Sequence, residues 1–352
     1  MLMLPLRSHC KGTFHELVKI ENILSADKMY IVPKNNLILN ITFAWEQAIA
    51  ITDDNDEGKY ISNRFPTFAF KDNQLPTFYK YIIPQKRLKY DLNVASPGGA
   101  GRNRVLNKKL FLSIPVNIPL LKEQEKISKF LTTVDKKITN LKNTITSLEN
   151  QKKGLLQQIF SQKLRFKDEN GNNYPNWEKK KLEDISNITM GQSPDSDFVN
   201  TEKIGTPFLQ GNAEFTNKYP IEKYWCTKPQ KIANPTDILL SVRAPVGAIN
   251  IANKKFCIGR GLSAISFNCN KLFGKYNLEF NLFQLIKKSQ GSTFSSINKK
   301  DISEVILFIP CLEEQTKIAD FLSAFDRKLE NQKAQLEHWK QIKKGLLQQM
   351  FV

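Results

Sequence analysis

Two stretches of the chain share one pattern of apolar residues, and this pattern predicts two long helices. In residues 118–160 and again in residues 309–351, apolar side chains recur in alternating steps of four and three. An apolar stripe with an average period of about 3.5 residues needs a partner helix to cover it. The stripe consists of Ile127, Leu131, Val134, Ile138, Leu141, Ile145 and Leu148 in the first stretch, and of Ile318, Leu322, Phe325, Leu329, Leu336 and Trp339 in the second, where Gln332 is the polar exception.

These two stretches are copies of one another. They align without a gap at a constant offset (310 − 119 = 191), and 21 of the 43 aligned positions are identical. Pro119 and Pro310 lie where a helix can begin, because proline in the first turn gives up no hydrogen bond that the helix needs. We expect the helices, each about 60 Å long, to pack antiparallel against each other. The alternative is two ordinary amphipathic helices, each in a core of its own.

The segments between the helices contain short runs rich in Ile and aromatic residues, bounded by Asn, Asp and Gly, which predict strands. Three runs of the second segment match runs of the first, at sequence offsets of 201, 200 and 197. Further along, Asn107 matches Asn298 at the same offset of 191 as the two helices (298 − 107). The chain is therefore predicted to duplicate one unit, a globular domain followed by a long helix. The runs are residues 28–33, 36–42, 48–51 and 65–70, and then 236–243, 247–251, 256–259 and 262–267.

The charge composition of the chain indicates a polyanionic binding partner. The formal net charge is +18 (52 − 34) and the pI is near 9.5, which in a folded protein favours nucleic acid as the partner. The alternative is a composition that is rich in lysine throughout. Five scattered cysteines without a CxxC pair indicate free thiols in a reducing compartment, and three histidines offer little for a metal site. No apolar run reaches the roughly 18 residues of a membrane span, so we expect a cytoplasmic protein.

Several motifs resemble those of the specificity subunits of type I restriction-modification systems. They are KLRF followed by YPNWEKKKLEDI, then MGQSPDS, GTPFLQGNAEF, DILLSVRAPVGAINIA and CIGRGLSAI, and IPxLxEQxKIxxFL, which occurs twice. The resemblance covers nearly all of residues 118–352 and, more loosely, residues 28–117.

The resemblance implies an α+β (mixed α/β) fold with two target recognition domains. The two conserved helical regions would form an antiparallel coiled coil with pseudo-two-fold symmetry. The expected boundaries are residues 1–117 and 166–308 for the recognition domains, and 118–165 and 309–352 for the helical regions.

The same resemblance implies a subunit that recognises a bipartite site in double-stranded DNA and directs adenine methylation or cleavage by its partners. These would be two methyltransferase (modification) subunits and restriction/translocase subunits. S-adenosylmethionine, ATP and Mg would bind to the partners, and no cofactor to this chain.

The first recognition domain departs from the family pattern. In the second domain, the stretch that begins at Trp177 precedes Asp237. Counting back from Asn36 by the same interval gives a position ahead of the first residue (237 − 177 = 60; 36 − 60 = −24). We therefore expect the N-terminal part of this domain to be missing, which puts recognition of the first half-site in doubt. The alternative functions are a coiled-coil scaffold or a degenerate recognition subunit without full site recognition.

The sequence predicts no catalytic or metal site. An adenine methyltransferase needs an Asn/Asp-Pro-Pro-aromatic loop, and Asn234-Pro-Thr-Asp does not match it. A glycine-rich cofactor loop should follow a strand, and the glycines from Gly98 do not. A nuclease needs carboxylates clustered around a divalent cation, and none are clustered here.

Candidate DNA contacts lie in predicted loops. Arg243 follows a strand run, and Arg260 lies between two glycines where the backbone can approach a ligand. Arginine is the commonest bidentate reader of guanine and also binds phosphate, although either residue could instead form a surface ion pair. Lys254 and Lys255 fall in a predicted hairpin turn and suit phosphate. The remaining candidates are Gln192, Ser193, Gln210 and Asn212 as base-edge readers, and Arg64, Arg102 and Arg104 in the first domain.

Both helices end in the same motif, KKGLLQQ followed by Ile or Met and then Phe. A simple two-helix coil would turn only Leu155 and Ile159, or Leu346 and Met350, inward. We expect the methyltransferase subunits to dock on the remaining apolar side chains; the alternative is that these side chains cap the adjoining globular domains. They are Leu156, Phe160, Leu347 and Phe351.

Overall fold

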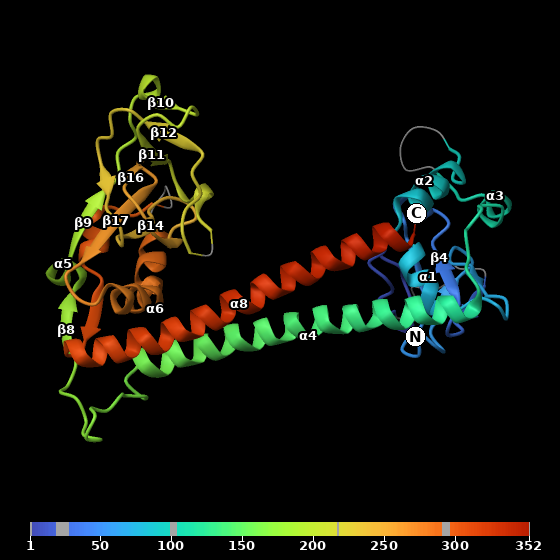
Figure 1. Cartoon of the computed structure of the whole chain (residues 1–352), viewed down its shortest axis with the longest axis horizontal. Helices are drawn as coiled ribbons and strands as arrows, with labels where there is room; N and C mark the ends of the chain where they lie inside the picture. The colour runs from blue at the N-terminus through green and yellow to red at the C-terminus, as the bar shows by residue number, and fades with distance from the viewer. Residues whose placement is uncertain (1, 19–27, 99–103, 217, 291–295, 352) are drawn as a thin grey trace. The chain divides into compact units, whose positions relative to one another are not determined.

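The computed structural model describes residues 2–18, 28–98, 104–216, 218–290 and 296–351 (Figure 1). The chain divides into two compact units, Met1–Lys142 with Ala334–Val352 and Asn143–Lys333. Each unit holds a globular domain and a stretch of both long helices, α4 (Leu121–Phe160) and α8 (Leu312–Met350). The expected α+β fold with two long helices is confirmed by the elements that follow.

Each long helix begins two residues after its proline, and a glutamine in its first turn anchors that start. The side-chain amide of Gln124 donates to the carbonyl of Pro119 at 2.8 Å and accepts from the backbone N–H of Leu75 at 2.8 Å. Gln315 repeats this with Pro310 at 2.9 Å and Asn270 at 3.0 Å. The first turn of each helix is thereby tied to the domain that precedes it.

The apolar stripe of α4 is buried from Leu131 to Leu148, whereas in α8 only Ile318 and Leu322 are buried and the rest of the stripe is half-buried. In α4, Leu131, Val134, Ile138, Leu141, Ile145 and Leu148 are all buried. In the second unit, Lys152 Nζ lies 2.6 Å from Asp326 Oδ1, and Glu149 Oε1 lies 2.7 Å from Lys333 Nζ. The residue number falls along α4 as it rises along α8, so the helices pair antiparallel there.

A tyrosine, an aspartate and a lysine join the first domain to the paired helices. The hydroxyl of Tyr81 donates to Asp135 Oδ2 at 3.1 Å, and Lys343 Nζ lies 2.6 Å from Asp135 Oδ1 and 5.8 Å from the Tyr81 ring. Burial, together with a smaller contribution from the charge of Asp135, raises the pKa of Tyr81 to about 12. Tyr81 therefore keeps its proton at neutral pH and acts as the donor.

The second unit contains the same network. The hydroxyl of Tyr276 donates to Asp326 Oδ2 at 2.6 Å, and Lys152 Nζ lies 5.2 Å from the Tyr276 ring. Burial, followed by the hydrogen bond to Asp326, raises the pKa of Tyr276. Asp326 is the counterpart of Asp135 in the repeat, and Lys343 is the counterpart of Lys152 (326 − 135 = 343 − 152 = 191). Both copies of the repeat are therefore fastened by equivalent side chains.

One sheet of each domain is antiparallel and has the same strand order in both units. In the second unit the order is β15 (Ile249–Ile251), β14 (Ile238–Ser241), β17 (Leu262–Phe267) and β9 (Ser186–Met190). In the first unit the described strands are β5 (Ile49–Ile51), β4 (Leu37–Leu39) and β7 (Thr67–Phe68).

The pairing register confirms the offsets that the sequence gives. Leu37 pairs with Ile51 and Phe68, while Ile238 pairs with Ile251 and Ile265. The three pairs of equivalent residues are offset by 201 (238 − 37), 200 (251 − 51) and 197 (265 − 68). The duplicated strands therefore meet the same partners in both domains.

A second, mixed sheet also repeats, and it begins earlier in the chain than sequence reasoning placed a strand. In the first unit its order is β2 (Glu16–Leu17), β1 (Leu2–Met3), β6 (Tyr60–Ser62) and β3 (Met29–Ile31). In the second the order is β10 (Val199–Asn200), β12 (Tyr224–Cys226), β11 (Thr206–Leu209), β16 (Phe256–Ile258) and β13 (Ile232–Ala233). In each sheet one central pair is parallel, β1 with β6 and β11 with β16.

The hairpin predicted around Lys254 and Lys255 is wrong. Strand β15 pairs with β14, whereas β16 pairs with β11 and β13. The two lysines therefore lie in a connection that crosses from one sheet to the other.

Short helices complete the domains. They are α1 (Pro76–Ile82), α2 (Lys86–Val94), α3 (Lys108–Leu112) and η2 (Ala44–Glu46) in the first unit, and α5 (Leu182–Ile185), α6 (Lys271–Gln290), α7 (Lys299–Ser303), η3 (Ser196–Phe198) and η4 (Asn212–Glu214) in the second. Asn107 caps α3 and Asn298 caps α7, which confirms that the repeat returns to the offset of 191.

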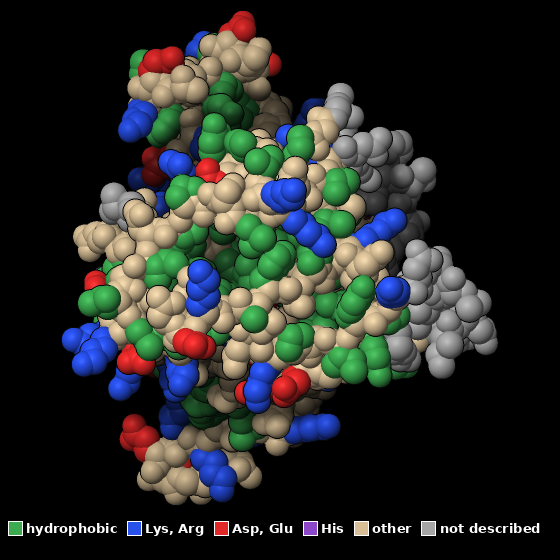
Figure 2. All heavy atoms as spheres, turned by 90° about the vertical axis from the view of Figure 1, so that its right-hand side faces the viewer, with side chains coloured by type: hydrophobic (Ala, Val, Ile, Leu, Met, Phe, Trp, Pro, Cys, Tyr) green, Lys and Arg blue, Asp and Glu red, His purple; other side chains and the backbone are tan. Residues whose placement is uncertain are grey.

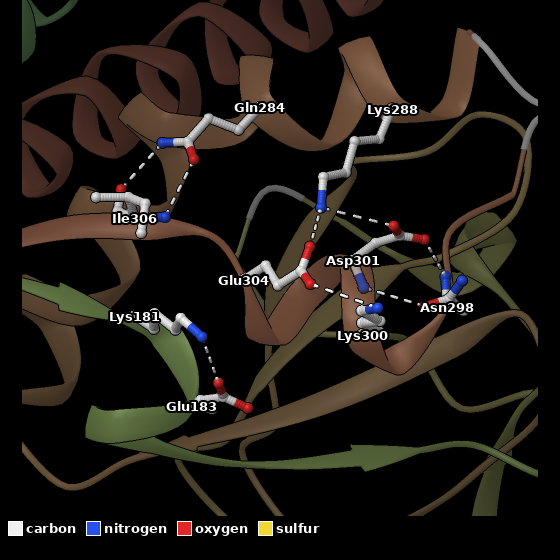
Figure 3. Close-up of polar contacts among 9 residues, drawn as sticks. All are labelled: Lys181, Glu183, Gln284, Lys288, Asn298, Lys300, Asp301, Glu304 and Ile306. Atoms are coloured by element: carbon white, nitrogen blue, oxygen red, sulfur yellow. Dashed lines mark hydrogen bonds and ion pairs between the residues drawn. The ribbon is translucent and has the colours of Figure 1, made fainter.

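Polar side chains fix α6 of the second unit against its neighbours (Figure 3). Lys288 reaches Glu304 Oε2 at 2.8 Å and Asp301 Oδ1 at 3.6 Å, and so joins α6 to α7. Gln284 exchanges two hydrogen bonds with the backbone of Ile306, in β18 (Ile306–Ile309). That strand pairs antiparallel with β8 (Glu178–Lys181).

The paired helices predict a specific loss of stability. Leu322→Ala empties a site that is 0% exposed and should lower the free energy of unfolding by about 2–5 kcal/mol. Leu120→Ala, at a side chain that is 83% exposed, should change it by less than about 0.5 kcal/mol. Urea unfolding followed by circular dichroism measures both variants, and equal losses would contradict the packing described here.

Candidate nucleic-acid interface

Three loops of the second unit meet backbone to backbone beside the ends of β9, β11 and β16. Gly191, Gly259 and Gly261 make this approach possible. A Cβ on Gly191 would collide with the carbonyl oxygen of Gly259, and a Cβ on Gly261 would lie 2.7 Å from the carbonyl oxygen of Gln210. Any side chain at these glycines would push the loops apart.

The same loops carry most of the predicted base-edge readers. Ser193 Oγ accepts a hydrogen bond from Gln210 Nε2 at 3.1 Å and another from the backbone N–H of Arg260 at 3.3 Å. The backbone N–H of Gln192 donates to the carbonyl of Ile258 at 2.9 Å. Gln192, Ser193, Gln210 and Arg260, far apart in the sequence, are therefore neighbours in the structure.

Arg243 and Asn212 flank this cluster. The backbone N–H of Val242 donates to the carbonyl of Gly261 at 2.9 Å, which places Arg243 beside the loop of Arg260. Asn212 lies two residues after Gln210 and begins η4. The side chains of Gln192, Gln210, Arg243 and Arg260 are exposed. We call Gln192, Ser193, Gln210, Asn212, Arg243 and Arg260 the loop cluster; its guanidinium and amide groups have the donors and acceptors that read base edges and bind phosphates.

The structure places the two predicted lysines away from the loop cluster. Lys255 precedes β16 and Arg260 follows it, so they lie at opposite ends of that strand. Lys254 Nζ is 2.7 Å from Glu222 Oε1, which offsets part of its charge.

In the first unit the predicted arginines are less concentrated. Arg64 is exposed, and its carbonyl accepts from the backbone N–H of Ile41 at 3.0 Å, which is the counterpart of the bond between Gly261 and Val242. Arg104 is held over the Trp45 ring at 5.5 Å and donates to Asn93 Oδ1 at 2.6 Å. Arg102 lies outside the described residues.

Sequence reasoning missed a cavity of about 480 Å³ around Arg104. Its basic and aromatic lining suits a phosphate beside a stacked ring. The sequence of α2 could have indicated this cavity, because Lys86, Lys89, Tyr90 and Asn93 are spaced by three, one and three positions and therefore share one helix face. The cavity is lined by His9, Trp45, Glu46, Lys86, Lys89, Tyr90, Asn93 and Arg104. Figure 2 shows Lys and Arg side chains spread among hydrophobic ones over the face that it draws.

The apolar ends of the long helices are more covered than expected. Phe160 is 5% exposed, and its ring packs against Phe280 at 5.6 Å, Phe273 at 5.7 Å and Trp177 at 6.2 Å. The expectation that Phe160 has surface left to cover is therefore wrong, because it caps its own domain. Phe351 packs 5.4 Å from Phe78 and is half-buried, as are Leu156 and Leu347.

Among the described residues, no three His, Cys, Asp or Glu side chains gather in a way that could hold a metal ion. In the same part of the chain, no helix is long and apolar enough to cross a membrane.

Comparison with known proteins gives one consistent result. The model of the family described as type I restriction modification DNA specificity domain matches residues 12–150 and 174–338. The chain is 37% identical over 252 residues to the putative type I restriction enzyme MjaX specificity subunit of Methanocaldococcus jannaschii. The alignment covers 69% of this chain and 59% of that protein, so the chain spans less than two thirds of the length of this relative. It is 24% identical over 289 residues to the MjaVIII specificity subunit of the same organism, covering 76% of this chain and 68% of that one.

Solved structures agree on the fold. The HsdS subunit from Thermoanaerobacter tengcongensis superposes with a TM-score of 0.51 at 24% identity, covering 100% of this chain and 90% of that one. A chain solved in work on complex assembly and conformational transition of the type I R-M system gives 0.60 at 25% identity, covering 97% and 86%. The S subunit from M. genitalium gives 0.63 at 15% identity, covering 93% and 85%.

The close approach of the loops can be tested by adding one methyl group. Gly191→Ala should force the loop cluster open and cost about 1–3 kcal/mol of unfolding free energy. Gly154→Ala, at a helical glycine with open space around its Cβ position, should be neutral or stabilising by up to about 1 kcal/mol. Thermal unfolding and amide exchange of residues 191–193 and 259–261 measure the difference. Unchanged exchange in Gly191→Ala would contradict the packing of the three loops.

Proposed function

The chain belongs to the family of type I restriction modification DNA specificity domains, and we propose that it is the DNA-recognition subunit of a restriction-modification complex. The observation that carries the proposal is the loop cluster. Two exposed arginines and three amide side chains from separate loops gather there, and arginine and amide groups are the usual readers of guanine and adenine in the major groove. A coiled-coil scaffold alone would leave these side chains without a role.

In this proposal the two domains each take one half of a bipartite site in double-stranded DNA. Lys254, Lys255, Arg64, Arg102 and Arg104 contribute positive charge, and phosphate contacts of this kind position a protein without specifying sequence. The net charge of +18 supports an electrostatic contribution to binding. The chain performs no chemistry of its own.

The chemistry belongs to the partners in this proposal. Two methyltransferase subunits and the restriction/translocase subunits assemble with this chain in the cytoplasm and carry S-adenosylmethionine, ATP and Mg. Leu156 and Leu347 occupy equivalent positions near the ends of the two long helices (347 − 156 = 191), so a partner that recognises one should recognise the other.

DNA binding should depend strongly on salt and on the loop cluster. With roughly 6–10 phosphate contacts, affinity should fall about 10³–10⁵-fold between 50 and 200 mM salt. Arg260→Ala should weaken binding to the cognate site by about 1–3 kcal/mol, whereas Lys167→Ala, at an exposed lysine elsewhere in the same unit, should have little effect. Fluorescence anisotropy with the site identified by methylation sequencing measures both. Salt-independent binding, or methyl transfer by the chain alone, would overturn the proposal.

The proposed arrangement of partners predicts the stoichiometry, and therefore the mass, of the complex. The complex with the methyltransferase should contain two of its subunits for each copy of this chain, as measured by native mass spectrometry. Leu347→Asp together with Leu156→Asp should reduce that stoichiometry, because each change places a charge on a half-buried apolar surface. Exposed Lys153→Asp serves as the control for added negative charge. A stable one-to-one complex of the unaltered chain would contradict the arrangement.

A further inference from the structure

A recess of about 370 Å³ lies in the first unit, where the start of α1 meets α4. Gln124 joins the two elements there, because its side-chain carbonyl accepts from the backbone N–H of Leu75 at 2.8 Å. Hydroxyl and ammonium groups dominate the lining of the recess. We call it the hydroxyl recess and define it by Thr77, Ser128, Lys129, Thr132, Thr133 and Lys136.

Ser128 is a buried hydroxyl in this recess. The side chain is 5% exposed, yet among the described residues its Oγ has no hydrogen-bond partner. Burial of a hydroxyl without a partner costs free energy, and a serine inside a helix can avoid this cost by bonding back to a carbonyl of the preceding turn. The counterpart of Ser128 in the repeat is Ala319 (128 + 191), which is 2% exposed and carries no such cost. The first copy therefore buries a donor that the packing of the helix does not require.

The other hydroxyls that α4 contributes already donate within the protein. Thr133 Oγ1 donates to the carbonyl of Lys129 at 2.8 Å. Thr132 Oγ1 lies 3.2 Å from the hydroxyl of Tyr81, and because Tyr81 donates its own proton to Asp135, Thr132 is the donor of this pair. Among the described residues of α4 that line the recess, Ser128 therefore has the hydroxyl proton that is left for a ligand.

The charge of the recess favours an anion. Lys129 and Lys136 are two helical turns apart on one face of α4, and both are exposed. Glu125 is the one acidic side chain of the lining. Neither lysine forms an ion pair with a carboxylate of the described residues, whereas Lys343 pairs with Asp135 nearby. Two unpaired ammonium groups thus flank the buried donor.

The second copy of the repeat lacks this chemistry. Lys129 corresponds to Asp320, so a cation in one copy is an anion in the other (129 + 191). Thr133 corresponds to Ala324 (133 + 191), which has no hydroxyl. Two helices with the same register and the same apolar stripe therefore differ at the positions that would contact an anion.

The equivalent face of α8 is also open to solvent. Asp320 and Arg327, the counterparts of the two lysines, are exposed. In that unit residues 164–185 pack against the start of α8, where Arg165 Nε lies 2.8 Å from Glu314 Oε1. The face stays open although that segment is present. The hydroxyl recess is therefore not a place that the corresponding segment of the duplicated unit covers.

We propose that the hydroxyl recess binds a phosphate group. Ser128 donates its hydroxyl proton to one phosphate oxygen, and Lys129 and Lys136 balance the negative charge. Thr77 provides a further hydroxyl from α1. Lysine, serine and threonine are common protein partners of phosphate oxygens.

The volume of about 370 Å³ leaves room for the group that carries the phosphate, so the ligand is a phosphate ester. Its source is the DNA backbone or a free nucleotide, which present the same chemistry to these side chains. The hydroxyl recess shares no residue with the loop cluster, so this proposal does not rest on the proposed function.

Titration of the full-length chain with inorganic phosphate, followed by phosphorus NMR at constant ionic strength, tests the proposal. Binding should be saturable. Ser128→Ala and Lys129→Asp each introduce the residue of the second copy, and each should weaken binding about tenfold or more, because each removes a hydrogen bond to a charged group. Lys137→Asp, at an exposed lysine of α4 outside the recess, is the matched control and should leave binding unchanged.

Threonine methyl NMR locates the ligand. Phosphate should shift the signals of Thr77, Thr132 and Thr133 and leave that of Thr139, further along α4, in place. Short duplex DNA that causes the same shifts would identify a backbone phosphate as the ligand, and adenosine 5′-monophosphate that causes them when DNA does not would identify a free nucleotide. Either result supports the proposal.

Three outcomes would overturn the proposal. Absence of saturable binding would do so, and so would unchanged binding in Ser128→Ala. Equal weakening by Lys129→Asp and Lys137→Asp would show that binding follows overall charge rather than the recess. Shifts caused by inorganic phosphate, but by neither DNA nor the nucleotide, would contradict the assignment of a phosphate ester.

Discussion

The structure depends on the burial of one apolar stripe by another. A helix of 40 residues such as α4 has no core of its own, so a side chain such as Leu131, 0% exposed, is buried only by packing against other elements. Burial of each such side chain contributes roughly 1.5–3 kcal/mol. The helices in turn provide the anchors for the domains, through Gln124 and Gln315 at their starts and through Asp135 and Asp326 further along.

Much of the fold could be predicted because the sequence contains an internal repeat, so each pattern occurs twice. The helices follow from a side-chain period that has one interpretation over several turns, and the strands around Leu37 and Ile238 follow from matching offsets. Strands β1 and β2 were missed because two residues are too few to show a period. The turn at Lys254 was misjudged because local sequence does not record which sheet the flanking strands join. Pairing partners are decided by tertiary contacts, which a turn of two lysines does not encode.

The candidate site likewise has a part that the sequence predicted and a part that only the structure shows. Arg260 could be singled out because glycines on both sides allow a close backbone approach, and the structure brings Ser193 and Gln210 to it. The cavity around Trp45 and Arg104 was not predicted because its walls come from segments that are far apart in the sequence. Phe160 illustrates a general limit: an apolar residue at a helix end shows that something covers it, and only the fold shows that Trp177 and Phe273 do.

The exchange of lysines between the two copies has a consequence for ancestry. Tyr81 and Asp135 belong to one copy of the repeat, and the lysine that reaches them, Lys343, belongs to the other. Lys152 returns the contact to Asp326. Contacts in which residue i of one copy meets residue j of the other, and j meets i, are those of an isologous dimer. A half-length chain with one copy would satisfy its own aspartate only by meeting an identical molecule, so the repeat has the contact pattern expected of two fused subunits of a homodimer.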